Sequence, residues 1–284
     1  MTLIIAGWLV YRTLSPIPAE AWQRLIRNLL STPAWILGLL FSLSLANWGI
    51  EILKWKAAIL SINPINFIRS ARETLIAFSI GFVTPLKLGE YAVKTQFYRE
   101  IKKQKVILRH FYCHFSQLLC TLLFGLFGLM NFESTARILK FDASWIILIL
   151  GLGLFILLLY RSNKAELKKV VELPRASILK ITGLSALRMI IFSVMLLIGL
   201  HLMGSDLPWT QTIYGLWTMY LIQVIAPTFS FLDLAVKSGG ALFVFQELIP
   251  AQVTMGAIVL QYFLSQVLPL IFGLILKPSD SKPQ

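Results

Sequence analysis

The chain has 284 residues, of which 57% are hydrophobic and 14% charged, and its mean hydropathy is +0.76. This composition excludes a soluble domain with a single core and is typical of an integral membrane protein. The net charge is +13. Because no nucleic-acid-binding fold or interleaving of aromatic residues accompanies the basic residues, we relate this charge to membrane topology and expect no nucleic-acid partner.

The predicted elements begin with an amphipathic helix at the membrane surface and continue with apolar spans. Residues 19–30 separate apolar from basic side chains, which favours an interfacial helix. Residues 1–10 are apolar but too short to cross unaided, so they form either a tilted partial span or the rest of a truncated one. The segments predicted to cross the membrane are residues 34–53, 111–130, 145–160, 178–203 and 255–276.

Two further segments, residues 64–98 and 209–249, are interrupted by proline and carry charges. Proline ends a helix and removes a backbone donor, as at Pro85 and Pro227. Polar backbone at membrane depth needs a partner or a water-filled cavity. We therefore predict two broken hairpins, one entering from each side of the membrane.

The predicted fold class is an all-α polytopic membrane protein with about six full spans and two proline-broken hairpins. One integral membrane domain covers residues 1–284, and its halves, residues 33–130 and 144–276, are predicted to form an inverted repeat. Most Lys and Arg residues fall on one side of these spans. By the positive-inside rule we expect a plasma-membrane protein with both termini cytoplasmic, including a short tail at residues 277–284.

Five charged residues fall at membrane depth in this arrangement. A charge at the centre of a membrane helix costs roughly 2.5–3.5 kcal/mol, so these side chains are expected to face the protein interior. They are the predicted substrate-binding residues Glu90, Lys94, Arg188, Asp233 and Lys237.

The charged segments at residues 90–95 and 233–238 share the pattern acid-x-Ala-Val-Lys-hydroxyl. Broken segments at matching positions in two halves indicate a transporter-type site near the midplane. In this interpretation the cations bind an anionic headgroup, and the two acids pair with an amine or carry a proton. In the alternative, each acid forms a strut with the lysine four residues later.

Residues 47–56 and 82–92 resemble the transmembrane family of lysylphosphatidylglycerol synthases, also called flippase-like. The specific part is Thr84-Pro85 followed by Gly89-Glu90. Pro227 and Asp233 approximate the second proline motif of that family. The resemblance implies a role for Thr84, Pro85, Gly89 and Pro227 in the structural motif, and an anionic or aminoacylated lipid as partner.

The leading functional hypothesis is therefore translocation of a phospholipid, or of a lipid-linked anionic headgroup, across the cytoplasmic membrane. A membrane-embedded lipid-modifying transferase and a non-catalytic accessory subunit are the alternatives. Because the chain ends soon after the last predicted span, we expect no aminoacyl-transfer domain and no lysyltransferase activity. A separate lipid-modifying enzyme or a second copy of the chain would be the protein partner.

Other polar residues suggest weaker hypotheses. Four residues of one segment have spacing that a metal could use: His110, Cys113, His114 and Cys120. No acidic residue lies near them in the sequence, so we expect ordinary packing, no metal and no cofactor. Glu51 is one turn from Lys54, which predicts a snorkelling pair near the interface.

Overall fold

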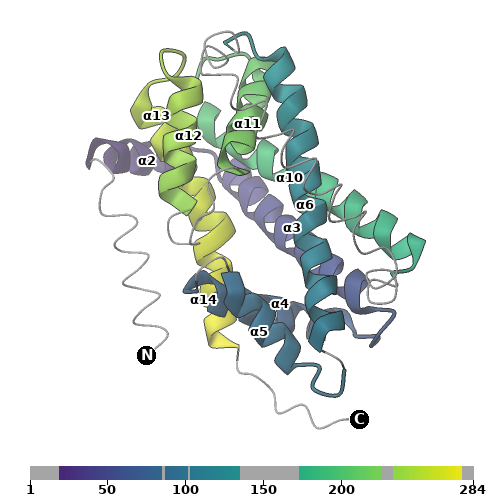
Figure 1. Ribbon diagram of the computed structural model, residues 1–284. Coiled ribbons are helices and arrows are strands. Elements are labelled where there is room, and N and C mark those ends of the chain that lie inside the picture. Colours follow the sequence, from purple (N-terminus) through teal and green to yellow (C-terminus); the bar gives the residue numbers. More distant parts are fainter. Residues whose placement is uncertain (1–18, 85–86, 102, 135–172, 225–232, 277–284) are drawn as a thin grey trace.

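The computed structural model describes residues 19–84, 87–101, 103–134, 173–224 and 233–276, and every regular element in these ranges is a helix (Figure 1). Four of these helices are long and apolar enough to cross a membrane. The described part of the chain is thus all-helical, and its long apolar helices indicate a multi-pass membrane protein. The four helices are α3 (Ala34–Ile59), α6 (Lys103–Asn131), α10 (Arg175–Leu202) and the continuous helix Ala251–Ile275.

These four helices confirm the predicted spans at residues 34–53, 111–130, 178–203 and 255–276. Three of the four extend well beyond the predicted bounds, because hydropathy detects the lipid-facing part of a helix and not its ends. The predicted span at residues 145–160 lies outside the described residues. The total of about six spans and the inverted repeat stay predictions.

The last of the four spans contains a π-helical turn that α3 stabilises. It consists of α13 (Ala251–Tyr262), η3 (Phe263–Val267) and α14 (Leu268–Ile275). Pro269 has no N–H for the Ser265 carbonyl four residues earlier. Trp48 Nε1 donates to that carbonyl at 3.1 Å instead. A neighbouring helix thus satisfies a backbone group that proline has freed at membrane depth.

Two shorter helices, α5 and α11, pack against opposite halves of α6. Figure 1 shows α5 near the first half of α6 and α11 near its other end, while α4 packs on α5 and α12 packs on α11. Side-chain contacts agree, because α5 touches α6 at His110 whereas α11 touches it at Phe124 and Phe127. The shorter helices are α2 (Ala19–Ser31), α4 (Phe67–Phe82), α5 (Leu88–Gln96), α11 (Trp209–Val224) and α12 (Asp233–Phe245).

Small residues bring α6 and α11 into close contact. A Cβ at Gly125 would lie 2.6 Å from the Leu221 Cβ, and a Cβ at Gly128 would lie 2.7 Å from the Trp217 Cβ. Small residues at such crossings let helix backbones approach and gain packing contacts in lipid. This contact holds the second half of α6 in place, while its first half carries the polar side chains described next.

Candidate functional site

The turn between α4 and α5 determines where the Glu90 side chain points. Lys87 has a left-handed backbone (φ 57°) just before α5, and the Gly89 N–H donates to Thr84 Oγ1 at 2.8 Å. A Cβ at Gly89 would lie 2.8 Å from that hydroxyl oxygen and 2.9 Å from a carbonyl oxygen of α4, so a larger residue would strain the turn. Thr84 and Gly89 therefore close the turn that begins α5. Pro85 lies outside the described residues.

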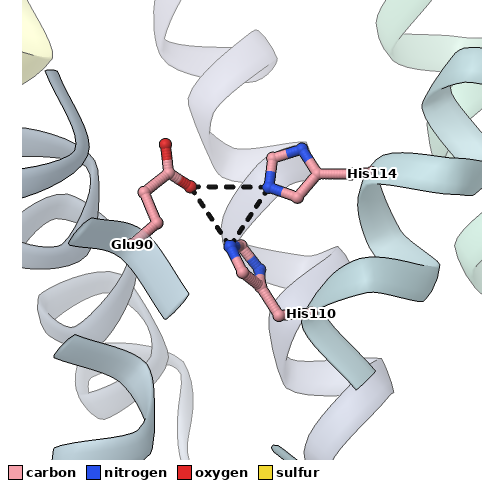
Figure 2. Close-up of side chains that lie close together, drawn as sticks. All are labelled: Glu90, His110 and His114. Carbon is pink, nitrogen blue, oxygen red and sulfur yellow. Dashed lines mark hydrogen bonds and ion pairs between the residues drawn. The ribbon is translucent and has the colours of Figure 1, made fainter. Parts of the chain in front are cut away.

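Glu90 reaches from α5 to two histidines on α6, and the three contacts close a triangle in Figure 2. Glu90 Oε2 lies 3.3 Å from His110 Nε2 and 3.5 Å from His114 Nε2, and the two Nε2 atoms are 3.1 Å apart. The Glu90 side chain passes over Gly81, where any Cβ would overlap it. Glu90 and His110 are buried, whereas the His114 side chain is 36% exposed.

Lys94 completes this group, which we call the Glu90 cluster (Glu90, Lys94, His110 and His114). Its Nζ lies 3.0 Å from His110 Nδ1 and 4.1 Å from the centroid of the Trp55 ring. A lysine ammonium has only donors, so it donates to Nδ1 and leaves the proton of a neutral His110 on Nε2. His110 thus lies between Glu90 and Lys94 and contacts both. In the alternative interpretation of the sequence, these two residues pair directly.

A second group, the Glu51 cluster, joins three spanning helices and consists of Asn47, Glu51, Lys54, Gln117 and Arg188. Glu51 Oε2 lies 3.1 Å from Lys54 Nζ and 3.0 Å from Arg188 Nη1. Lys54 Nζ also donates to Gln117 Oε1 (3.2 Å), and Arg188 Nε donates to Asn47 Oδ1 (3.2 Å). One carboxylate therefore holds two cations inside the bundle.

The Glu51 cluster corrects the prediction of a snorkelling Glu51–Lys54 pair. The ion pair forms, but Lys54 is 1% exposed and does not reach an interface. Gln117 and the Arg188–Glu51 contact explain the difference, since they give the pair partners within the protein. His114 and Lys94 also contribute to the electrostatic environment of Glu51, so the Glu51 and Glu90 clusters are neighbours.

A third group, the Asp233 cluster, consists of Asp233 and Lys237 at the start of α12. Lys237 Nζ lies 2.6 Å from Asp233 Oδ2, which is the i,i+4 strut that the alternative interpretation of the sequence predicts. The same Nζ lies 4.9 Å from the centroid of the Phe192 ring on α10. Phe192 follows Arg188 by four residues, so one face of α10 borders both the Glu51 and the Asp233 clusters.

The predicted substrate-binding residues thus fall into three groups rather than one. Glu90 and Lys94 belong to the Glu90 cluster, Arg188 to the Glu51 cluster, and Asp233 and Lys237 form their own pair. Within the described ranges, the two acid–lysine motifs have different partners. Pro227, like Pro85, lies outside those ranges.

The α3 and α6 residues of these clusters are not among the site residues that the charged motifs predict. A signal for them exists in the sequence, since each helix carries three polar residues at i, i+4 and i+7 within an apolar segment. This spacing puts three side chains on one helical face. The residues are Asn47, Glu51 and Lys54 on α3 and His110, His114 and Gln117 on α6.

A separate buried carboxylate, Glu73, has a structural role beside these clusters. It accepts hydrogen bonds from Trp55 Nε1 (2.8 Å), Arg69 Nε (3.0 Å) and the Tyr98 hydroxyl (2.6 Å). Burial and the nearby Glu73 carboxylate raise the pKa of Tyr98 well above its usual range, so the phenol stays a donor. Glu73 therefore links α3, α4 and the turn after α5.

Comparison of the chain with protein-family models, with curated proteins and with solved structures gave no match. The resemblance to the lysylphosphatidylglycerol synthase transmembrane family therefore stays a prediction from the Thr84-Pro85 and Gly89-Glu90 residues. The function has to be argued from the charges and contacts of the three clusters.

Proposed function

We propose that this protein moves a lipid with an anionic headgroup between the leaflets of the plasma membrane, with Arg188 as the principal headgroup ligand. The observation that carries the proposal is the uneven charge of the Glu51 cluster. One carboxylate, Glu51, contacts both Lys54 and Arg188 inside a bundle of apolar helices. An unbalanced cation at such a depth is costly, and an anion would offset its charge.

Arg188 suits a phosphate or carboxylate headgroup better than Lys54 does. Lys54 is fully buried, whereas the Arg188 side chain is 22% exposed and can be reached. A guanidinium has five N–H donors, more than its contacts with Glu51 and Asn47 require, and its planar fork matches two oxygens of an anion.

Lys237, on α12, provides a second cation beside the face of α10 that carries Arg188. Phe192 lies between them, one turn from Arg188 and beneath the Lys237 ammonium. A headgroup that leaves Arg188 would meet Lys237 next, while its acyl chains stay in contact with apolar helix surfaces. The resemblance to flippase-like proteins agrees with this path, and the distribution of basic residues favours cytoplasmic termini.

The test is leaflet exchange of labelled lipids by purified protein in sealed vesicles. We expect the wild type to accelerate exchange of an anionic lipid over protein-free vesicles, and Arg188→Gln to remove most of that acceleration. The matched control is Lys180→Gln, which neutralises an exposed cation two turns away on the same helix and should behave like the wild type.

Two results would contradict the proposal. Wild-type exchange no faster than in empty vesicles would exclude lipid translocation. Equal losses in Arg188→Gln and Lys180→Gln would show that the cluster has no special role, because only the total charge of α10 would then matter. A modified lipid formed by the wild type in detergent, without a sealed bilayer, would favour a membrane-embedded transferase instead.

A further inference from the structure

We propose that Glu90, His110 and His114 form a binding site for a divalent transition metal, with Zn²⁺ as the best fit and one coordination position left for an exogenous ligand. This inference goes beyond lipid movement and does not depend on it. The site combines a carboxylate from α5 with two imidazoles from successive turns of α6 (Figure 2). Two histidines with one glutamate are a known ligand set of catalytic zinc sites.

The spacing of the three donor atoms carries the proposal. The separations are 3.1 Å, 3.3 Å and 3.5 Å. Zinc binds nitrogen and oxygen at about 2.0–2.2 Å with tetrahedral angles, which separates its ligands by roughly 3.3–3.6 Å. One ion at about 2 Å from all three atoms therefore fits the triangle, and its fourth position points away from the plane of the donors.

Hydrogen bonds alone explain this triangle less well. The Lys94 contact puts the proton of a neutral His110 on Nε2, where it can point to either the Glu90 oxygen or His114 Nε2. If His114 Nε2 also carries a proton, the two N–H groups face each other at 3.1 Å. If it does not, its contact with Glu90 joins two acceptors. With Glu90 ionised, one edge of the triangle stays repulsive in either case, whereas a cation attracts all three atoms.

The surroundings of the three ligands favour a defined site. Glu90 and His110 are buried, and the Trp55 and Tyr91 rings pack against His110 with centroids at 5.8 Å and 4.5 Å. These contacts limit rotation of the imidazole. The exposed part of His114 gives an ion a route to the site. Imidazole ligands suit zinc better than Mg²⁺ or Ca²⁺, which prefer oxygen donors.

Lys94 is a positioning residue in this arrangement. A metal on His110 Nε2 requires the proton on Nδ1, which then needs an acceptor, as is usual for metal-bound histidines. The Lys94 ammonium would have to turn away from Nδ1, and the Trp55 ring at 4.1 Å already offers it a second partner. Replacing Lys94 with glutamine would supply an amide oxygen to accept the Nδ1 proton. Lys94→Gln is therefore expected to bind metal more tightly than the wild type.

The experiment uses the full chain in detergent, freed of metal with a chelator, with Zn²⁺ or Co²⁺ alone as the probe. We expect about one Zn²⁺ per chain by elemental analysis, and the visible absorption of tetrahedral Co²⁺, which Zn²⁺ should displace. His114→Ala and Glu90→Gln should each weaken Zn²⁺ binding at least about tenfold, and Lys94→Gln should strengthen it about tenfold. His201→Ala is the matched control, since His201 instead contacts Trp209 and the Leu197 carbonyl.

The wild type alone can overturn the proposal, so a variant that fails to fold does not leave it undecided. No tetrahedral Co²⁺ spectrum, or no rise in the unfolding temperature with Zn²⁺, would overturn it. Equal Zn²⁺ binding in His114→Ala and His201→Ala would do the same. Weaker binding in Lys94→Gln would exclude His110 Nε2 as a ligand. These readouts need neither lipid nor a sealed vesicle, so they are separate from the exchange assay.

Discussion

Glu51→Gln and Arg188→Gln break the same ion pair, but we expect them to lower the free energy of unfolding by different amounts. The reason is that the Glu51 cluster has one carboxylate and two cations. Glu51→Gln leaves Lys54 and Arg188 without their shared carboxylate, and it should lower the free energy of unfolding by about 3–5 kcal/mol, the range for breaking a buried ion pair. Arg188→Gln leaves the Glu51–Lys54 pair intact and balanced. It should lower the free energy of unfolding by about 1.5–3 kcal/mol, the scale of a lost hydrogen bond to a charged group.

Unfolding of the detergent-purified protein by a denaturing detergent, followed by tryptophan fluorescence, measures both free energies. The double variant separates the contributions, because removing Arg188 also removes one of the cations that Glu51→Gln strands. We expect the double variant to cost no more than Glu51→Gln alone. The reasoning is refuted if the two single substitutions cost the same, or if the cost of the double variant equals their sum.

Three further substitutions test the contacts that position the clusters, with the same unfolding assay. Gly128→Leu should force α6 away from α11 and lower the free energy of unfolding by about 1–3 kcal/mol. The control is Gly38→Ala, which has open space around its Cβ and should not lower this free energy. Equal effects of the two substitutions would contradict the role of close packing at Gly128. Trp55→Phe removes a donor to buried Glu73 and should cost about 1–3 kcal/mol, and a neutral result would show that this hydrogen bond is replaceable. Thr84→Val removes the hydroxyl that accepts from the Gly89 N–H in the first turn of α5, and it should lower the free energy of unfolding by about 0.5–2 kcal/mol; no change would show that another group accepts from this N–H.

The sequence was sufficient to predict the spanning helices because lipid imposes a simple rule, a long run of apolar residues. It was also sufficient to place charges such as Lys94 and Lys237 inside the protein, since lipid exposure is costly. The helix ends escaped prediction. Residues 103–110 contain Lys103, Lys105 and Arg109, yet they continue α6 without a break. Helix formation there depends on backbone hydrogen bonds, which hydropathy does not measure.

The partners of the charged residues could not be predicted in the same way. The four-residue spacing favours a Glu90–Lys94 strut as the alternative to a ligand site, but the carboxylate turns to His110 and His114 on another helix. That contact depends on the crossing of α5 over α6, which the turn after Thr84 and the small Gly81 make possible. Pairing across helices is a property of the packed structure, and a single sequence carries little information about it.

Zn²⁺ binding at the Glu90 cluster and headgroup binding at the Glu51 cluster are expected to be coupled electrostatically. His114 contributes to the charge environment of Glu51, so a divalent ion on His114 would raise the positive potential around the Glu51 cluster. An anionic headgroup at Arg188 would then bind more tightly with Zn²⁺ present. Because such coupling is reciprocal, the headgroup must strengthen Zn²⁺ binding by the same factor, and a typical coupling is roughly 5-fold or more. Phosphatidylglycerol and phosphatidylcholine in matched micelles provide the comparison, since both bury acyl chains but only the first has a net charge. A Zn²⁺ affinity that rises equally with both lipids would refute electrostatic coupling, because a change common to the two must come from the acyl chains.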